Sequence, residues 1–264
     1  MHSKIGSLMR HPTAIIHQNA KLAEDVEVGA YSIIGEHVEI GAGTKIGPHV
    51  VINGHTRIGR QNRIFQFSSL GEIPQDKKYA GEPTRLEIGD HNTIREFCTL
   101  NLGTVQDAGV TRVGNHNWIM AYVHLAHDCH IGNHTIFANN AQLAGHVEVG
   151  DYAILGGFTG VHQFCKIGAH VMTGVGTVVK LDVPPYVTVS GNPSTPFGTN
   201  AEGLKRRGFS TVAVTAIKRA YKTLYKSGLT LEQAKVVLSE QAAQHPELDI
   251  LIDFIGRSQR GIIR

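Results

Sequence analysis

The residues best suited to chemistry lie between positions 124 and 163. They are His124, His127, Asp128, Gly145, His146, His162 and Gln163. An imidazole exchanges a proton near neutral pH, and a neighbouring carboxylate orients its second ring nitrogen. A glycine amide has no side chain to shield it and donates readily to a developing oxyanion. These residue types predict acyl transfer to a hydroxyl, with His127 as base, Asp128 as orienting partner and Gly145 as oxyanion donor.

Other uses of these histidines remain open on composition alone. The chain has 16 histidines, and many belong to outward, structural positions. We assign a structural or interface role to His116, His134 and His170, which share one column of the repeat with Tyr152. A zinc site built from His124, His127 and His146 is an alternative. It lacks a ligand signature such as His-Glu-x-x-His, so we expect no metal.

A six-residue period must position the candidate site. Aliphatic residues recur every sixth position from Ile16 to Leu70 and from Ile88 to Leu100, and apolar residues, all aliphatic except Phe137, do so from Val113 to Ile167. Neither a helical period nor strand alternation explains one aliphatic residue in six. We predict a parallel β-helix in which three hexads form one coil of 18 residues, with coils about 4.8 Å apart. Residues 18 apart then stack, which puts His127 beneath Gly145 and Asp128 beneath His146.

The fifth position of each hexad is also small or branched, as at Val38, Thr44 and Val123. First and fifth positions share strand parity, so both point inward. All three cysteines, Cys98, Cys129 and Cys165, occupy fifth positions. We therefore expect them to be small core residues rather than catalytic thiols.

One outward column is apolar throughout, with Trp118, Ile136, Ile154 and Met172 spaced by 18 residues. An apolar stripe on a protein surface usually marks a partner interface. We expect a homo-oligomer, and the alternative is a loop folded over that side.

The repeat is interrupted twice and ends before the C-terminus. Residues 72–87 and 101–112 are polar, contain Gly or Pro, and indicate loops expelled from the coil. Residues 1–191 are predicted to form the β-helix and residues 192–264 a linker, at 192–200, and a small helical region. Ser210 is a predicted N-cap, Thr230 and Gln233 a capping box, and Pro246 the start of a third helix.

Composition limits the function classes. The net charge of +3 is too small to indicate nucleic-acid binding. The segment MHSKIGSLMR lacks the apolar run of a signal peptide, and no stretch approaches the length of a membrane span. Three cysteines form no paired framework, which favours a reducing cytoplasm.

Several long motifs make the chain resemble one family. They are QDKKYAGEPT at 75–84, HLAHDCHIGNH at 124–134, FANNAQLAGHV at 137–147, VHQFCKIGAHVM at 161–172 and AEGLKRRGFS at 201–210. The chain resembles the bacterial UDP-N-acetylglucosamine 3-O-acyltransferases over nearly its whole length. The resemblance implies a left-handed β-helix, contrary to the usual right-handed crossover, and a homotrimer with active sites between subunits.

The resemblance also implies a reaction. A (3R)-3-hydroxyacyl group would pass from acyl carrier protein to the 3-hydroxyl of UDP-N-acetylglucosamine, the first step of lipid A synthesis, without metal or organic cofactor. The acidic carrier protein would suit the basic C-terminal helices.

Site residues carry over by position. His127 would be the general base, Asp128 its partner and Gly145 the oxyanion donor. The residues that would hold the sugar, phosphates and acyl chain are Gln75, Asp76, Lys78, His124, His146 and Gln163, with His162 supporting the pocket. The residues near the nucleotide and the carrier's phosphopantetheine arm would be Asn200, Glu202, Arg206 and Arg207.

Two positions depart from the family pattern. Asn101-Leu102 stands where many members have His-Arg, which removes a basic contact. Val175 stands where some members have the Gly that ends the acyl pocket. The larger side chain predicts a shorter preferred acyl group.

Three other functions fit the sequence less well. The later N-acyltransferase of the same pathway would need an N-terminal uridine-binding domain, for which the repeats leave no room. A γ-type carbonic anhydrase would use interfacial histidines to bind zinc, but it gives no role to residues 75–84 or to the basic helices. A non-catalytic solenoid would need neither the His-Asp pair nor the loops.

Overall fold

The computed structural model describes residues 9–264, so most of the segment in which no signal peptide was predicted lies outside the described residues. The chain forms two compact units, Met1–Cys129 and His130–Arg264. The predicted domain boundary at residue 191 falls inside the second unit and stays a prediction.

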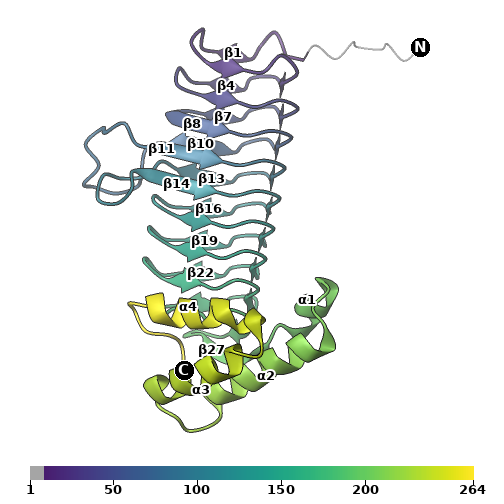
Figure 1. Cartoon of the computed structure of the whole chain (residues 1–264). Helices are drawn as coiled ribbons and strands as arrows, with labels where there is room; N and C mark the ends of the chain where they lie inside the picture. The colour runs from purple at the N-terminus through teal and green to yellow at the C-terminus, as the bar shows by residue number, and fades with distance from the viewer. Residues whose placement is uncertain (1–8) are drawn as a thin grey trace. The chain divides into compact units, whose positions relative to one another are not determined.

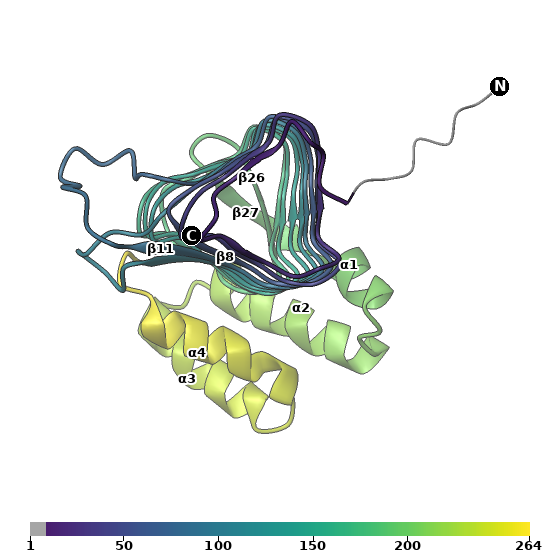
Figure 2. The ribbon, with the colours of Figure 1, turned by 90° about the horizontal axis from the view of Figure 1, so that it is seen from above.

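The first unit consists of three parallel sheets whose strands follow one another around a triangle (Figure 2). One sheet contains β1 (Ile15–Ile16), β4 (Ile33–Ile34), β7 (Val51–Ile52), β10 (Ser69–Glu72), β13 (Thr99–Asn101) and β16 (His124–Leu125). The second contains β2 (Lys21–Leu22), β5 (Glu39–Ile40), β8 (His55–Ile58), β11 (Arg85–Ile88) and β14 (Val110–Val113). The third contains β3 (Glu27–Val28), β6 (Lys45–Ile46), β9 (Arg63–Ile64), β12 (Thr93–Ile94) and β15 (Trp118–Ile119).

The second unit continues the same pattern and adds helices. Its strands are β17 (His130–Ile131), β18 (Ile136–Phe137), β19 (Gln142–Leu143), β20 (Glu148–Val149), β21 (Ile154–Leu155), β22 (Gly160–Val161), β23 (Lys166–Ile167), β24 (Met172–Thr173), β25 (Val178–Val179), β26 (Val187–Ser190) and β27 (Thr195–Thr199). Its helices are α1 (Ala201–Arg206), α2 (Thr211–Tyr225), α3 (Leu231–Ala242), the 3₁₀ turn η1 (Pro246–Leu248) and α4 (Asp249–Arg257).

The predicted 18-residue register is confirmed in both units. Ile15 pairs with Ile33 in the first unit, and Leu143 pairs with Val161 in the second. The first and fifth hexad positions point inward as expected, and Cys98, Cys129 and Cys165 are fully buried free thiols. Burial raises the pKa of Cys98 to about 12 and that of Cys165 to about 11, which suits core residues rather than nucleophiles.

Each coil turns its corner through a residue in the left-handed backbone conformation. Tyr31, His49 and Phe67 have φ between 55° and 63°, and their rings stack with centroids 5.2 and 5.4 Å apart. Few residues other than Gly adopt this conformation, with Asn, Asp and His the most tolerant. Corner residues therefore stack in columns that run along each unit.

The two predicted loops are present in the first unit, with narrower bounds. Residues 73–84 leave the coil between β10 and β11, and residues 102–109 leave it between β13 and β14 (Figure 1). Residues 85–87 and 110–112, predicted as loop, instead form parts of β11 and β14, because β11 pairs with both β8 and β14. The register resumes after each loop.

The C-terminal helices follow the predicted signals in part. Ser210 accepts from the Ala213 amide as N-cap of α2, and Thr230 forms a capping box with Gln233 on α3. Pro246 opens η1, and α4 begins only at Asp249.

Two elements near the helical region were not predicted. The 192–200 linker contains β27, an antiparallel partner of β26, and α1 follows directly. β27 lies at the edge of its sheet. Pro196 has no backbone N–H to donate, and an edge strand can accommodate it because one side of the strand has no neighbour. Across the described residues, no helix is long and apolar enough to cross a bilayer.

Candidate functional site

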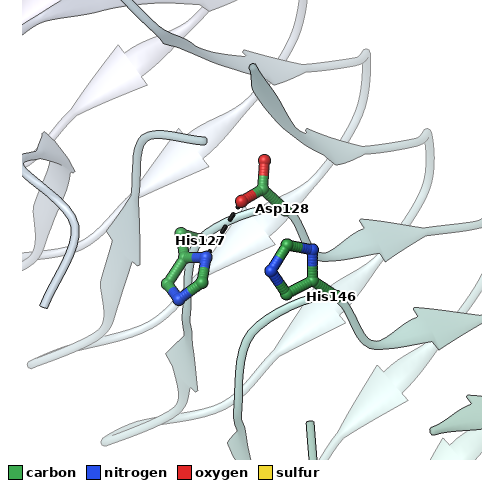
Figure 3. A group of neighbouring side chains, drawn as sticks. All are labelled: His127, Asp128 and His146. Carbon is green, nitrogen blue, oxygen red and sulfur yellow. Dashed lines mark hydrogen bonds and ion pairs between the residues drawn. The ribbon is translucent and has the colours of Figure 1, made fainter. Parts of the chain in front are cut away.

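The site in the first unit is centred on a hydrogen bond between a histidine and a buried aspartate at a coil corner. Asp128 follows β16 with a φ of 57°, and its amide donates to Thr111 Oγ1 over 2.8 Å. The His127 ring turns toward the Asp128 carboxylate (Figure 3), with Nδ1 2.9 Å from Oδ2. The Asp128 side chain is fully buried and that of His127 is 16% exposed. The predicted His127–Asp128 contact is thus present.

The tautomer of His127 follows from this contact. An ionised carboxylate only accepts hydrogen bonds, so Nδ1 carries the proton toward Asp128. The Nε2 lone pair of His127 is left to accept a proton from another group. This is the arrangement that a general base requires.

A residue that the sequence did not single out supports the pair. The Thr104 amide donates to both Asp128 oxygens over 2.9 and 3.0 Å, and its hydroxyl donates to Oδ2 over 2.6 Å. Thr104 belongs to the 102–109 loop, which has no period from which such a contact could be inferred.

His124 is the first residue of β16, three positions before His127. Its Nδ1 is 2.7 Å from Thr99 Oγ1, its partner in the neighbouring strand. Burial lowers the pKa of His124, and the nearby His127 adds to the effect. His124 is therefore neutral at physiological pH and able to donate or accept a hydrogen bond.

The loop residues predicted to bind substrate lie in the 73–84 segment. Asp76 organises the loop itself, because its carboxylate accepts from the Lys78 amide over 3.0 Å and its carbonyl accepts from the Tyr79 amide. Gln75 and Lys78 are exposed. Their side chains are thus available on a loop whose backbone is locally fixed.

The second unit holds the remaining predicted residues. Gly145 is buried, and its carbonyl accepts from the Phe164 amide over 3.1 Å. His146 (also drawn in Figure 3) stacks on Phe164 with centroids 4.3 Å apart. His162 and Gln163 are exposed on the next coil, as is Val175, at 78%. The stacking of His127 beneath Gly145 stays a prediction.

Asn200 and Arg207 flank α1 and attach it to one corner column of the second unit. Asn200 Nδ2 donates to the His170 carbonyl over 3.1 Å, while its Oδ1 caps α1. Arg207 donates to the Tyr152 carbonyl over 3.0 Å, and its guanidinium lies 5.2 Å from the Tyr152 ring centroid. Glu202 pairs with Lys205 on the exposed side of α1.

His170 is the buried centre of that attachment. It is 8% exposed and stacks between Tyr152 and Tyr186, so its predicted structural role fits its packing. Burial lowers the pKa of His170 to about 4, and the Arg207 guanidinium contributes. A guanidinium only donates, so the 3.5 Å approach of Arg207 Nη1 to His170 Nδ1 requires a neutral ring.

The comparisons with known proteins agree with these features. The model of bacterial transferase hexapeptide repeats matches residues 111–145, and that of the second domain of UDP N-acetylglucosamine O-acyltransferases matches residues 182–263. The chain is 68% identical to the acyl-[acyl-carrier-protein]--UDP-N-acetylglucosamine O-acyltransferase of Thiobacillus denitrificans, over 96% of this chain and 98% of that protein. Its Janthinobacterium counterpart is 61% identical over the same shares.

Solved structures give the same result. The UDP-N-acetylglucosamine O-acyltransferase of Moraxella catarrhalis matches with a TM-score of 0.96 at 47% identity, over 97% of this chain and 100% of that chain. The Francisella novicida acyltransferase matches with a TM-score of 0.95 at 45% identity, over 97% and 94%. These matches confirm the predicted fold class, a left-handed parallel β-helix of hexapeptide repeats with a small α-helical C-terminal region.

The low pKa of His170 predicts an acid-sensitive fold. Between about pH 6.5 and 4 the unfolded chain binds a proton at this residue and the folded chain does not, so stability falls as pH falls through that window. In an NMR titration the His170 ring should titrate near pH 4 and His124 below 6.5. A His170 midpoint at or above 6.5 would contradict the assignment.

Proposed function

The chain belongs to the family of UDP-N-acetylglucosamine O-acyltransferases, and from this premise we propose that His127 is the general base of its reaction. The chain is an enzyme that transfers an acyl group from acyl carrier protein to UDP-N-acetylglucosamine, the first step of lipid A biosynthesis. The observation that supports His127 is its hydrogen bond to a fully buried carboxylate, which leaves Nε2 free of the proton.

The proposed chemistry balances with these residues alone. His127 Nε2 takes the proton of the sugar 3-hydroxyl as that oxygen attacks the thioester carbonyl carbon. The Gly145 amide donates to the oxyanion. Collapse of the tetrahedral intermediate breaks the carbon–sulfur bond, and the imidazolium returns the proton to the departing carrier thiolate. Asp128 stabilises the imidazolium in between.

The remaining predicted residues keep binding roles in this proposal. Gln75, Asp76 and Lys78 present polar groups on one loop, and His124, as a neutral ring, suits a hydroxyl or phosphate oxygen. We propose binding roles for His146, His162 and Gln163 of the second unit as well. We propose a (3R)-3-hydroxyacyl donor and no cofactor.

The carrier protein would dock on the basic helical region. Lys218, Arg219, Lys222 and Lys226 are exposed on and just after α2, and Arg206 is exposed on α1. Cations so arranged favour an acidic partner. We also propose that the protein is cytoplasmic, because its three cysteines are buried free thiols.

Loss of the base should remove most of the activity. We expect His127→Ala to lower kcat by at least ~100-fold, the low end for a lost general base. His91→Ala removes an exposed imidazole that stacks on His116 in the same unit and serves as control. Steady-state rates with UDP-N-acetylglucosamine and acyl carrier protein measure both. Near-normal turnover by His127→Ala would remove it from this role.

Chain-length preference tests the proposed role of Val175. This side chain is exposed beside Gly176 in the turn after β24, and as the end of an acyl pocket it would shorten that pocket. Rates with 3-hydroxyacyl carrier proteins of graded length should favour a shorter donor, and Val175→Gly should move the optimum to a longer one. An unchanged optimum in the variant would refute the assignment.

The homotrimer is also a proposal. Met172 is 39% exposed in the second unit, where it pairs with Ile154 and continues the apolar column, and Trp118 is 42% exposed in the first. Sedimentation should give three times the 28.6 kDa of one chain. Met172→Lys should weaken the trimer, because it buries a charge in an apolar contact, while Gln142→Lys, outward on another side, should not. A monomeric wild-type protein would exclude the trimer.

A further inference from the structure

The Asp128 carboxylate is a charge that the fold buries completely. Such a charge is stable only when hydrogen bonds satisfy its oxygens. Besides the His127 contact, the carboxylate accepts from the amide and from the hydroxyl of one loop residue, Thr104. We propose that Thr104 is a positioning residue of the acyl transfer, acting on His127 through Asp128. This inference rests on the proposed role of His127 as base.

Thr104 contacts both oxygens of the carboxylate. The Thr104 amide bridges both oxygens, which sets the plane of the carboxylate. The Thr104 hydroxyl and His127 Nδ1 share Oδ2, at 2.6 and 2.9 Å. The orientation in which Oδ2 faces His127 Nδ1 therefore depends on its contacts with Thr104.

Thr104 is itself held in place by the residues just before it. The Leu102 amide donates to the Glu72 carbonyl over 3.0 Å, and the Gly103 amide donates to the Arg85 carbonyl over 3.2 Å. A side chain on Gly103 would collide with the backbone of Val110. The root of the 102–109 loop is thus tied to both ends of the 73–84 loop, and Thr104 is only 1% exposed.

The effect on catalysis follows from two requirements. Hydrogen bonds to the ionised form of a carboxylate favour that form, and an ionised Asp128 is what keeps the His127 proton on Nδ1. A base must also stand within hydrogen-bonding reach of the proton it takes, and a misplacement of about 1 Å costs about 100-fold in rate. Loss of the Thr104 hydroxyl therefore weakens the preference for a proton on Nδ1 of His127. It also lets the His127 ring move away from the proton that it must take.

A merely structural role for Thr104 predicts something else, namely loss of stability without loss of turnover per folded molecule. Thr44 offers a matched comparison in the same unit. It is fully buried, its hydroxyl donates to the Gly59 carbonyl over 2.9 Å and accepts from the Asn62 amide. Thr44 directly precedes β6, which belongs to a different sheet from β16, so Thr44→Val removes a comparable contact elsewhere.

We expect Thr104→Val to lower kcat by about 10- to 100-fold with KM for UDP-N-acetylglucosamine within about threefold of wild type. Thr104→Ser keeps the donor and should recover kcat to within about threefold of wild type. Thr44→Val should lose thermal stability and retain wild-type kcat. Thr104→Ala, with less crowding, carries the same expectation as Thr104→Val if the latter does not fold.

Nitrogen NMR of the His127 ring gives a readout that does not depend on turnover. In the wild-type protein Nδ1 should carry the proton, and in Thr104→Val the Nε2-protonated form should become populated. The proposal is overturned if Thr104→Val keeps kcat within about twofold, if Thr104→Ser is as impaired as Thr104→Val, or if the ring tautomer is unchanged. Retained activity in His127→Ala would instead refute the proposed role of His127 as general base, whatever the NMR spectra of the ring show.

Discussion

Hydrogen bonding between stacked coils is the constraint on which the rest of each unit depends. Every strand is too short to be stable alone, so each donates to the carbonyls of the next coil, as Gly29 does to Ile46. Side chains are consequently fixed by their place in the coil. Where a loop is inserted, pairing skips it, and Leu100 pairs with Leu70 and with Leu125 without loss of register. The loops can therefore vary while the corners stay in line.

The candidate site is built from residues at the corners of the coils. A left-handed residue points its side chain along the edge of the coil, where rings stack and carboxylates meet neighbouring side chains. Asp128 occupies such a corner, and an inserted loop closes over it with Thr104. The reactive pair thus combines a position set by the repeat with a support that the repeat does not contain. Rigid placement of this kind suits a base that must not move during proton transfer.

The features that could be predicted from the sequence are those that follow from the six-residue period or from other local patterns. The inward residues, the 18-residue register, the buried cysteines and the caps at Ser210 and Thr230 follow from local pattern, and the contact of His127 with Asp128 follows from adjacency. Thr104 could not be found, because a loop of irregular length gives no spacing from which to place its side chain. The strand β27 was missed because Pro196 and Gly198 are poor strand formers that only pairing with β26 accommodates. The buried ladder of Asn62, Asn92 and Asn117 was also missed; in it the Asn92 and Asn117 backbone amides donate to the side chains of Asn62 and Asn92.

Some of the basic side chains near α1 already have partners within the protein, so they add little to the positive surface of the helical region. Arg206 and Arg207 are neighbours with the same formal charge, yet Arg207 is committed to the Tyr152 carbonyl and ring, whereas Arg206 faces solvent. Lys205 and Lys235 are likewise matched by Glu202 and Glu232. An approaching anionic molecule thus meets fewer uncompensated cations than the number of basic residues suggests, chiefly Arg206 on α1 and the exposed Lys and Arg side chains of α2. This distribution of charge would favour one orientation of approach over many.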